Sequence, residues 1–394
     1  MDWNNLLEWF TLILRWFHVM AAISWIGSSM YVLWLGRMFA GAGQGDPQQR
    51  GEPWMIHSTG VALAARFNSG SDQTLKLLHW FQRESALLWV SGFMMLYFIY
   101  YSAGGALLTV TSVSLPQLLA FALLSALLLG AGWVIYDALW TSPLGRRPAW
   151  AAGVSLALLA LLAWGLQQVF SGRAVFIHVS SILGTLMFAN VWLRLAPALK
   201  DRAGAAASGR TPDASLWARA QVRSQHNDYL MFPVVATMLA GHIAAVHGGP
   251  LAWLLLSLML VAFAAGRHVV VTNLKSRGAL LVLLLALAVM IALTARTAVE
   301  IAPKSETLVP FAAAQQIVTA RCLACHSATP ADRRFGPAPG GLSLDAPEDL
   351  RRHAGRIKSR IIDQQMVPIA DHPQLTAQER SVLSAWIAQG ASLQ

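Results

Sequence analysis

Long apolar segments recur through the first 300 residues. No other feature of the sequence restricts the possible folds of the chain as strongly. Each segment has the length of about 20 residues that a helix needs to cross the core of a bilayer. Of the whole chain, 56% is hydrophobic and 12% is charged, whereas about a quarter of a soluble domain is charged. We expect an all-α fold with eight membrane-spanning helices, near 9–36, 80–102, 117–140, 149–170, 174–197, 228–247, 250–272 and 278–299.

Basic residues gather in alternate loops between these segments. Among the loops between these segments, the odd-numbered ones carry all of the arginine and lysine except Arg173, which lies in an even-numbered loop. Because basic loops remain in the cytoplasm, the odd loops are expected inside and both ends of the chain outside. The same bias explains the formal net charge of +10 without nucleic acid as a partner.

The sequence Cys322-Leu323-Ala324-Cys325-His326 has the pattern that attaches a c-type haem. Its two cysteines, the only ones in the chain, would form thioethers, and His326 would be an axial iron ligand. With no other cysteine, a disulfide scaffold is excluded, and a zinc site of four thiolates is too. Because c-type haem is attached outside the cytoplasmic membrane, this motif places the C-terminus on the side that the loop charges predict.

Residues 308–394 are typical of one small helical cytochrome c, joined by a linker over 301–307 to the eight helices of residues 1–300. Met366 is the only methionine after Met290, and a thioether opposite histidine completes many cytochrome c haems. His353 and His372 are competing ligands.

A helix over 309–320 is expected to lead into the haem motif. After Met366, the sequence from Thr376 to Glu379 forms a capping box that opens a last helix, and Gly390 ends it.

Ionisable residues inside membrane spans are costly and usually functional. In the outer half, His18 and His242 are expected at similar depth on two helices, so this pair would either ligate a b-type haem or make structural hydrogen bonds. For His178 and His247 we expect a structural role.

The inner half carries denser polar clusters at the ends of the second, fifth, sixth and seventh spans. Arginines at such positions often extend to the interface, but Glu84, Asn227 and Asp228 flank or enter apolar stretches. The cluster members include His79, Trp80, Glu84, Asn190, Arg223, His226, Asn227, Asp228, Arg267 and His268.

Nearly the whole chain resembles the membrane-bound, cytochrome c-linked urate oxidases, also called urate hydroxylases. The matching stretches are His79-Trp80-Phe81, Trp89-Val90-Ser91-Gly92-Phe93, Gly184-Thr185-Leu186-Met187, Ala189-Asn190-Val191, Arg223-Ser224-Gln225-His226-Asn227 with Pro233 and His242, and the segment from Cys322 through Met366 to Trp386. The resemblance implies oxidation of urate to 5-hydroxyisourate, with electrons leaving through the cytochrome and no hydrogen peroxide formed.

A site for planar, anionic urate needs a cation, hydrogen-bond partners, an aromatic face and a base. The catalytic candidates are His79, Glu84, His226, Asn227 and Asp228, and the substrate-binding candidates are Asn190, Arg223, His268 and Trp80, with Arg267 as an alternative cation. A competing hypothesis places urate on the outer side, near His178 and His247.

The expected electron acceptor is a soluble or membrane cytochrome c or a terminal oxidase. The expected location is the inner membrane of a bacterium, with the N-terminus and the cytochrome domain in the periplasm. The alternative function is a membrane electron carrier between quinol, or a partner protein, and soluble cytochromes. Such a carrier needs haem ligands but no buried cluster of arginine, histidine, asparagine and carboxylates.

Overall fold

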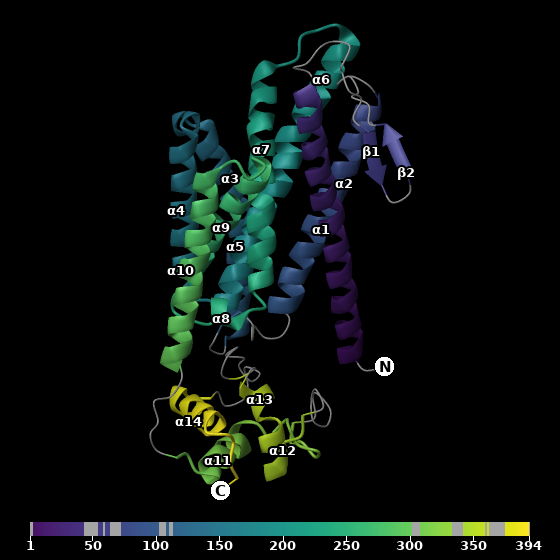
Figure 1. The fold of residues 1–394 in the computed structure, drawn as a ribbon. Coiled ribbons are helices and arrows are strands. Elements are labelled where there is room, and N and C mark those ends of the chain that lie inside the picture. The colour runs from purple at the N-terminus through teal and green to yellow at the C-terminus, as the bar shows by residue number, and fades with distance from the viewer. Residues whose placement is uncertain are drawn as a thin grey trace. The chain divides into compact units, whose positions relative to one another are not determined.

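The computed structural model describes residues 3–42, 54–57, 60–63, 72–101, 108–109, 113–301, 308–332, 342–358, 361 and 375–393. These residues are predominantly helical, as the sequence predicts (Figure 1). The two strands among them, β1 (Trp54–His57) and β2 (Gly60–Leu63), form one short antiparallel pair.

The helices of the first 301 residues include eight of 19 residues or more. In chain order the helices are α1 (Trp3–Ala42), α2 (Asp72–Tyr100), α3 (Leu115–Thr141), α4 (Pro148–Gln167), α5 (Gly172–Asn190), α6 (Ala196–Ser208), α7 (Ala214–Ala240), α8 (Ala244–His247), α9 (Ala252–Val271) and α10 (Arg277–Ile301). A 3-10 turn (Pro143–Arg146) precedes α4, and a π-helical turn (Val191–Leu195) joins α5 to α6.

A long helix overlaps each of the eight expected spans, and six helical stretches among the described residues are long and apolar enough to cross a membrane. The two that fall short, α2 and α7, are interrupted by polar side chains, including Glu84 and Asp228. The count of eight spans therefore stays a prediction. The sixth expected span, 228–247, is displaced, because α7 begins in polar sequence at Ala214 and ends at Ala240.

The chain divides into two compact units. The α1/α2 unit comprises Phe10–Met95 and Leu183–Met231, and the α9/α10 unit comprises Met1–Trp9, Leu96–Ile182 and Phe232–Gln394. In the α9/α10 unit, α10 and α4 both pack against α9 (Figure 1).

In the α1/α2 unit, aromatic rings join α2 to α5. Trp89 stacks on Phe188 with 4.9 Å between ring centroids and donates its indole N–H to Thr185 Oγ1 at 3.0 Å. The π-helical turn also contacts α2, where Trp192 Nε1 donates to Ser85 Oγ at 3.2 Å. These contacts hold the polar stretch of α2 against the end of α5.

His178 is a buried residue of the α9/α10 unit, and its ring is hydrogen-bonded on both sides. Its Nδ1 lies 2.6 Å from the carbonyl oxygen of Ala174, and its Nε2 lies 2.7 Å from Ser125 Oγ and 3.1 Å from the Tyr101 hydroxyl. Because both ring nitrogens have partners, the arrangement agrees with the structural role expected of this histidine.

The C-terminal segment has a hydrophobic core of its own, made by α11 (Phe311–Arg321), α12 (Pro347–Arg352), α13 (Ala354–Ile357) and α14 (Ala377–Ala388). Trp386 at its centre is 1% exposed. The capping box at the start of α14 is confirmed, since Thr376 Oγ1 accepts from the Glu379 N–H and Glu379 accepts from the Thr376 N–H. Gly390 follows the helix with a φ of +93°, which glycine adopts without strain.

Candidate functional site

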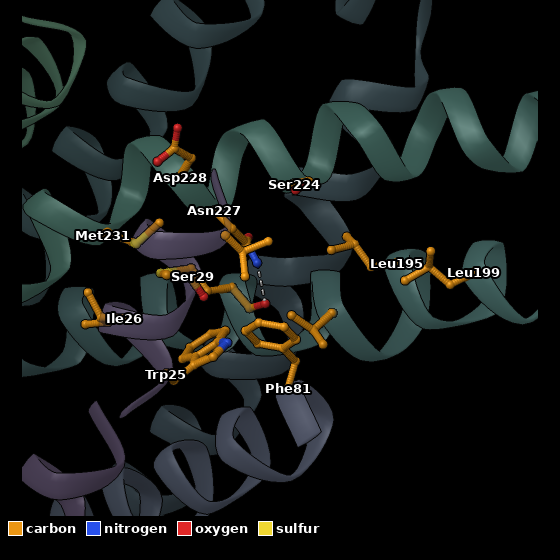
Figure 2. A pocket seen from close by; sticks show the side chains of 13 residues that line it. Trp25, Ile26, Ser29, Phe81, Leu195, Leu199, Ser224, Asn227, Asp228 and Met231 are labelled. Carbon is orange, nitrogen blue, oxygen red and sulfur yellow. Dashed lines mark hydrogen bonds between the residues drawn. The ribbon is translucent and has the colours of Figure 1, made fainter. Parts of the chain in front are cut away.

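A cavity of about 300 Å³ lies within the α1/α2 unit, a volume at the lower end of small-molecule sites. Most of its wall is apolar, and the aromatic rings of Trp25 and Phe81 stand side by side on one side of it (Figure 2). The lining residues are Trp25, Ile26, Ser29, Val32, Phe81, Met187, Val191, Leu195, Leu199, Ser224, Asn227, Asp228 and Met231.

The π-helical turn shapes one wall of this cavity. Met187, Val191, Leu195 and Leu199 all line it and follow one another at four-residue intervals. In a regular α-helix, a stripe of this spacing would rotate by about 40° at each step. The wider π-helical turn, in which the Ala196 N–H bonds the Val191 carbonyl, reduces that rotation. The turn therefore helps keep the four side chains on one face.

Asn190 and Asn227 form the polar centre of the cavity wall. Asn190 Nδ2 donates to Asn227 Oδ1 at 2.9 Å. Asn227 Nδ2 in turn donates to the Met187 carbonyl at 2.9 Å, a bond between two lining residues (Figure 2). Both contacts orient the amide of Asn227, leaving one N–H and one lone pair for other partners. Asn190 is fully buried and is not part of the lining, so its contact with the cavity is indirect.

The other predicted residues of α7 lie around Asn227. Asp228 is 4% exposed and lines the cavity, although its carboxylate points away from Trp25 and Phe81 in Figure 2. Arg223, 1% exposed, stands one helical turn before Asn227. His226 is half-buried and does not line the cavity.

Glu84 lies in α2, one turn after the cavity-lining Phe81, and is 6% exposed. Ser24 Oγ donates to its Oε1, and Ser28 Oγ donates to its Oε2 at 3.2 Å. These two serines are one turn apart on α1 and flank Trp25. Glu84 does not itself line the cavity, but Phe81 on its own helix and Trp25, next to Ser24, both do. A hydroxyl holds each oxygen of the carboxylate.

Several predicted residues lie elsewhere. His79 and Trp80 are exposed residues of α2, and Phe81 contributes the aromatic ring for which the sequence had suggested Trp80. Arg267 and His268 belong to the α9/α10 unit, where the Arg267 guanidinium lies 5.5 Å from the centroid of the Phe232 ring.

Sequence reasoning did not single out Ser24 or Ser28. The only available signal was the serine spacing, four residues apart along an apolar helix.

The two histidines expected to bind a b haem lie in different units. His18 Nδ1 is 2.9 Å from Ser91 Oγ on α2. A side chain at Gly92 would meet the ring, since its Cβ would lie 2.9 Å from His18 Cε1. His242 is exposed in the turn that follows α7, rather than inside the helix.

The haem motif follows α11. The His326 N–H donates to the Cys322 carbonyl at 2.8 Å, so the two residues lie on one tight turn. His326 Nδ1 is 3.1 Å from the Leu342 carbonyl oxygen, which can only accept a hydrogen bond, so Nδ1 carries the proton and Nε2 is the basic nitrogen. The geometry fits a c-type haem. Met366 lies outside the described residues.

Asp345 ties the haem motif to the segment that contains Leu342. Its Oδ2 accepts the Ala328 N–H at 2.8 Å and the Ser343 hydroxyl at 2.6 Å. Hydrogen bonds from the Ser343 and Ser327 hydroxyls, together with the bond from the Ala328 N–H, hold the pKa of Asp345 below its usual value. The carboxylate is therefore charged at neutral pH and keeps the turn after His326 in place.

Comparison with known proteins gives one result that bears on function. Residues 4–298 match the family model described as "Urate oxidase N-terminal". No curated protein and no solved structure matches the chain.

Proposed function

We propose, from the premise that the chain belongs to the urate oxidase N-terminal family, that it oxidises urate to 5-hydroxyisourate in a membrane and passes the electrons to a C-terminal c-type haem. The observation that carries the proposal is the cavity of about 300 Å³ in the α1/α2 unit, with its aromatic side and its oriented amide.

The reaction sets what the site must supply. The urate monoanion and one water give 5-hydroxyisourate, one proton and two electrons. The C–O bond forms at the ring carbon, and an O–H bond of the water breaks. A site for this reaction needs a slot for a planar ring, partners for its polar edge, a compensating cation, a proton acceptor and an electron acceptor.

The cavity and its surroundings offer a slot for the ring, partners for its polar edge and a cation. Trp25 and Phe81 offer faces on which a purine ring can lie, and the free N–H and lone pair of Asn227 suit the alternating carbonyl and N–H groups of its edge. Arg223, buried one turn from Asn227, is the cation that would offset the anionic charge.

Proton transfer falls to the carboxylates of the same unit. Asp228 lines the cavity, and Glu84 lies one turn after Phe81, which also lines it. His226 is the alternative base on α7. Asn190, which sequence reasoning placed among the substrate contacts, would act instead by orienting Asn227.

The C-terminal segment supports the electron acceptor. Cys322 and Cys325 would hold a haem by thioether bonds, and His326 Nε2 would ligate its iron, with Met366 as the proposed opposite ligand. Bound there, the haem would supply a one-electron acceptor at the end of the chain. Both ends of the chain would lie in the periplasm, and a b haem at His18 and His242 belongs to the same proposal.

The test is an anaerobic absorption spectrum of the purified, haem-loaded protein before and after addition of urate. We expect the bands of the reduced c haem to appear, and 5-hydroxyisourate to form without hydrogen peroxide. A haem that dithionite reduces but urate does not would refute the enzyme and favour an electron carrier, which has no use for the cavity.

A further inference from the structure

We infer that Glu84 receives the proton released when the substrate is oxidised, and that Ser24 and Ser28 of α1 position its carboxylate for that transfer. The inference rests on the proposed function and adds to it a role for α1. Three features of the Glu84 site support it: its burial, the nature of its partners, and its place near two residues that line the cavity.

Burial comes first. Glu84 is 6% exposed and Ser85, the next residue, is fully buried, within a helix that overlaps an expected membrane span. A carboxylate in such surroundings costs free energy unless it is hydrogen-bonded or paired, so its presence calls for a functional reason.

The partners of Glu84 suit a group that changes its protonation state. Each carboxylate oxygen has one serine hydroxyl, Ser24 on Oε1 and Ser28 on Oε2. A hydroxyl can donate or accept, whereas an arginine or lysine can only donate and would keep the carboxylate charged. A serine pair therefore suits both the charged and the neutral form.

The Ser28 hydroxyl has a second set of acceptors. Its Oγ lies 2.6 Å from the Ser24 carbonyl oxygen and 3.2 Å from the Trp25 carbonyl oxygen, as well as 3.2 Å from Glu84 Oε2. When Glu84 gains a proton, the Ser28 hydroxyl can donate to its own helix, and its oxygen can accept the new Glu84 O–H. The cluster can thus take up one proton without leaving a buried polar group unpaired.

Glu84, Ser24 and Ser28 do not line the cavity, but two residues close to them on α1 and α2 do. Trp25, which lies between the two serines in sequence, and Phe81, one turn before Glu84, both line the cavity. In the proposed step, the O–H bond of the adding water breaks and an Oε–H bond forms on Glu84. The two electrons leave the substrate towards the c haem, which is reoxidised between electrons by the acceptor cytochrome.

The experiment compares Glu84→Gln, Glu84→Asp, Ser24→Ala and Ser28→Ala in the full-length, haem-loaded protein. Ser257→Ala is the matched control, because the Ser257 hydroxyl donates to the Trp253 carbonyl of its own helix. Anaerobic steady-state reduction of added soluble cytochrome c by urate gives kcat and KM. We expect Glu84→Gln to lower kcat by about 10²- to 10⁴-fold, the usual contribution of a proton-transfer group. Its KM should change less than threefold.

Glu84→Asp should retain part of the activity, and each serine variant should lower kcat by roughly tenfold, the loss expected from one hydrogen bond to a charged group. Infrared difference spectra, recorded on adding urate anaerobically, supply a readout that a structural role would not change. The wild type should show a new carbonyl band of a protonated carboxylic acid. That band should shift in Ser24→Ala and Ser28→Ala and be absent from Glu84→Gln.

Two results would overturn the inference: a wild-type kcat in Glu84→Gln, or the same protonated-carboxyl band in that variant. If Glu84→Gln loses haem or folds poorly, Glu84→Asp and the serine variants decide by the infrared band alone. A wild-type protein whose haem urate does not reduce would refute the proposed function instead, so the two failures are distinguishable.

Discussion

Replacing Asn190 and Asn227 by alanine tests whether an oriented amide in the cavity wall binds the edge of the substrate. Asn227→Ala removes the group proposed to contact the substrate edge, and Asn190→Ala removes the donor that holds Asn227 Oδ1 at 2.9 Å. A hydrogen bond to a charged partner contributes about 1.5–3 kcal/mol, and 1.4 kcal/mol is tenfold in rate or affinity. We therefore expect Asn227→Ala to lower kcat/KM for urate by roughly 10- to 150-fold.

Asn190→Ala should cost less, because the Asn227 amide keeps its bond to the Met187 carbonyl at 2.9 Å. A loss of about 1 kcal/mol, or roughly fivefold, follows from one neutral hydrogen bond. Because the role proposed for Asn190 is to orient Asn227, the double variant should be no worse than Asn227→Ala alone.

The assay is anaerobic steady-state reduction of added soluble cytochrome c by urate, with rates divided by haem content. Gln168→Ala is the matched control, since Gln168 is an exposed amide that donates to the Trp164 carbonyl of its own helix. Strictly additive losses in the double variant would refute the positioning role of Asn190. An unchanged kcat/KM in Asn227→Ala would remove this cavity wall from the substrate site.

Three further predictions concern the haems and the C-terminal core. Met366→Ala should leave the c haem covalently attached but lower its reduction potential, and an unchanged potential in a redox titration would exclude Met366 as a ligand. Acid-acetone extraction should release a non-covalent haem from the wild type and none from a protein lacking His18 and His242, whereas no haem from either would leave those histidines with other roles. Thr376→Ala should cost about 1 kcal/mol, seen as faster hydrogen exchange in α14. Unchanged exchange in that variant would contradict the role of the Thr376 hydroxyl. The backbone N–H of Thr376, which the variant keeps, lowers the pKa of Glu379, so the stability from that bond should be full above the ordinary carboxyl pKa and be lost as the pH falls through the lowered value.

The sequence was sufficient to locate the long helices, because hydropathy and length report directly on what a bilayer requires. It also placed the capping box and the terminal glycine of α14, since both are local signals. It gave the bounds of α7 less well. Hydropathy marks where a segment turns apolar, whereas backbone hydrogen bonds continue through Arg223 and Asn227 without regard to polarity.

The candidate site was predictable in residue type but not in arrangement. Polarity alone selected Asn190, Asn227, Asp228 and Glu84, since an apolar span needs a reason to contain them. It could not show that Asn190 is fully buried behind Asn227, because depth across a helix depends on what packs against each face. The π-helical turn at Val191–Leu195 adds to this difficulty, since periodicity arguments assume 3.6 residues per turn.

The role of α1 could not be predicted from its own sequence either. Ser24 and Ser28 are ordinary residues for an apolar helix, where a serine hydroxyl usually bonds a carbonyl of its own chain. What distinguishes them is the carboxylate of Glu84, 60 and 56 residues away in sequence. A polar residue on one span can therefore be interpreted only with its partner on another. The sequence contains both halves of the Glu84 cluster, and the contact between α1 and α2 gives them a shared chemistry.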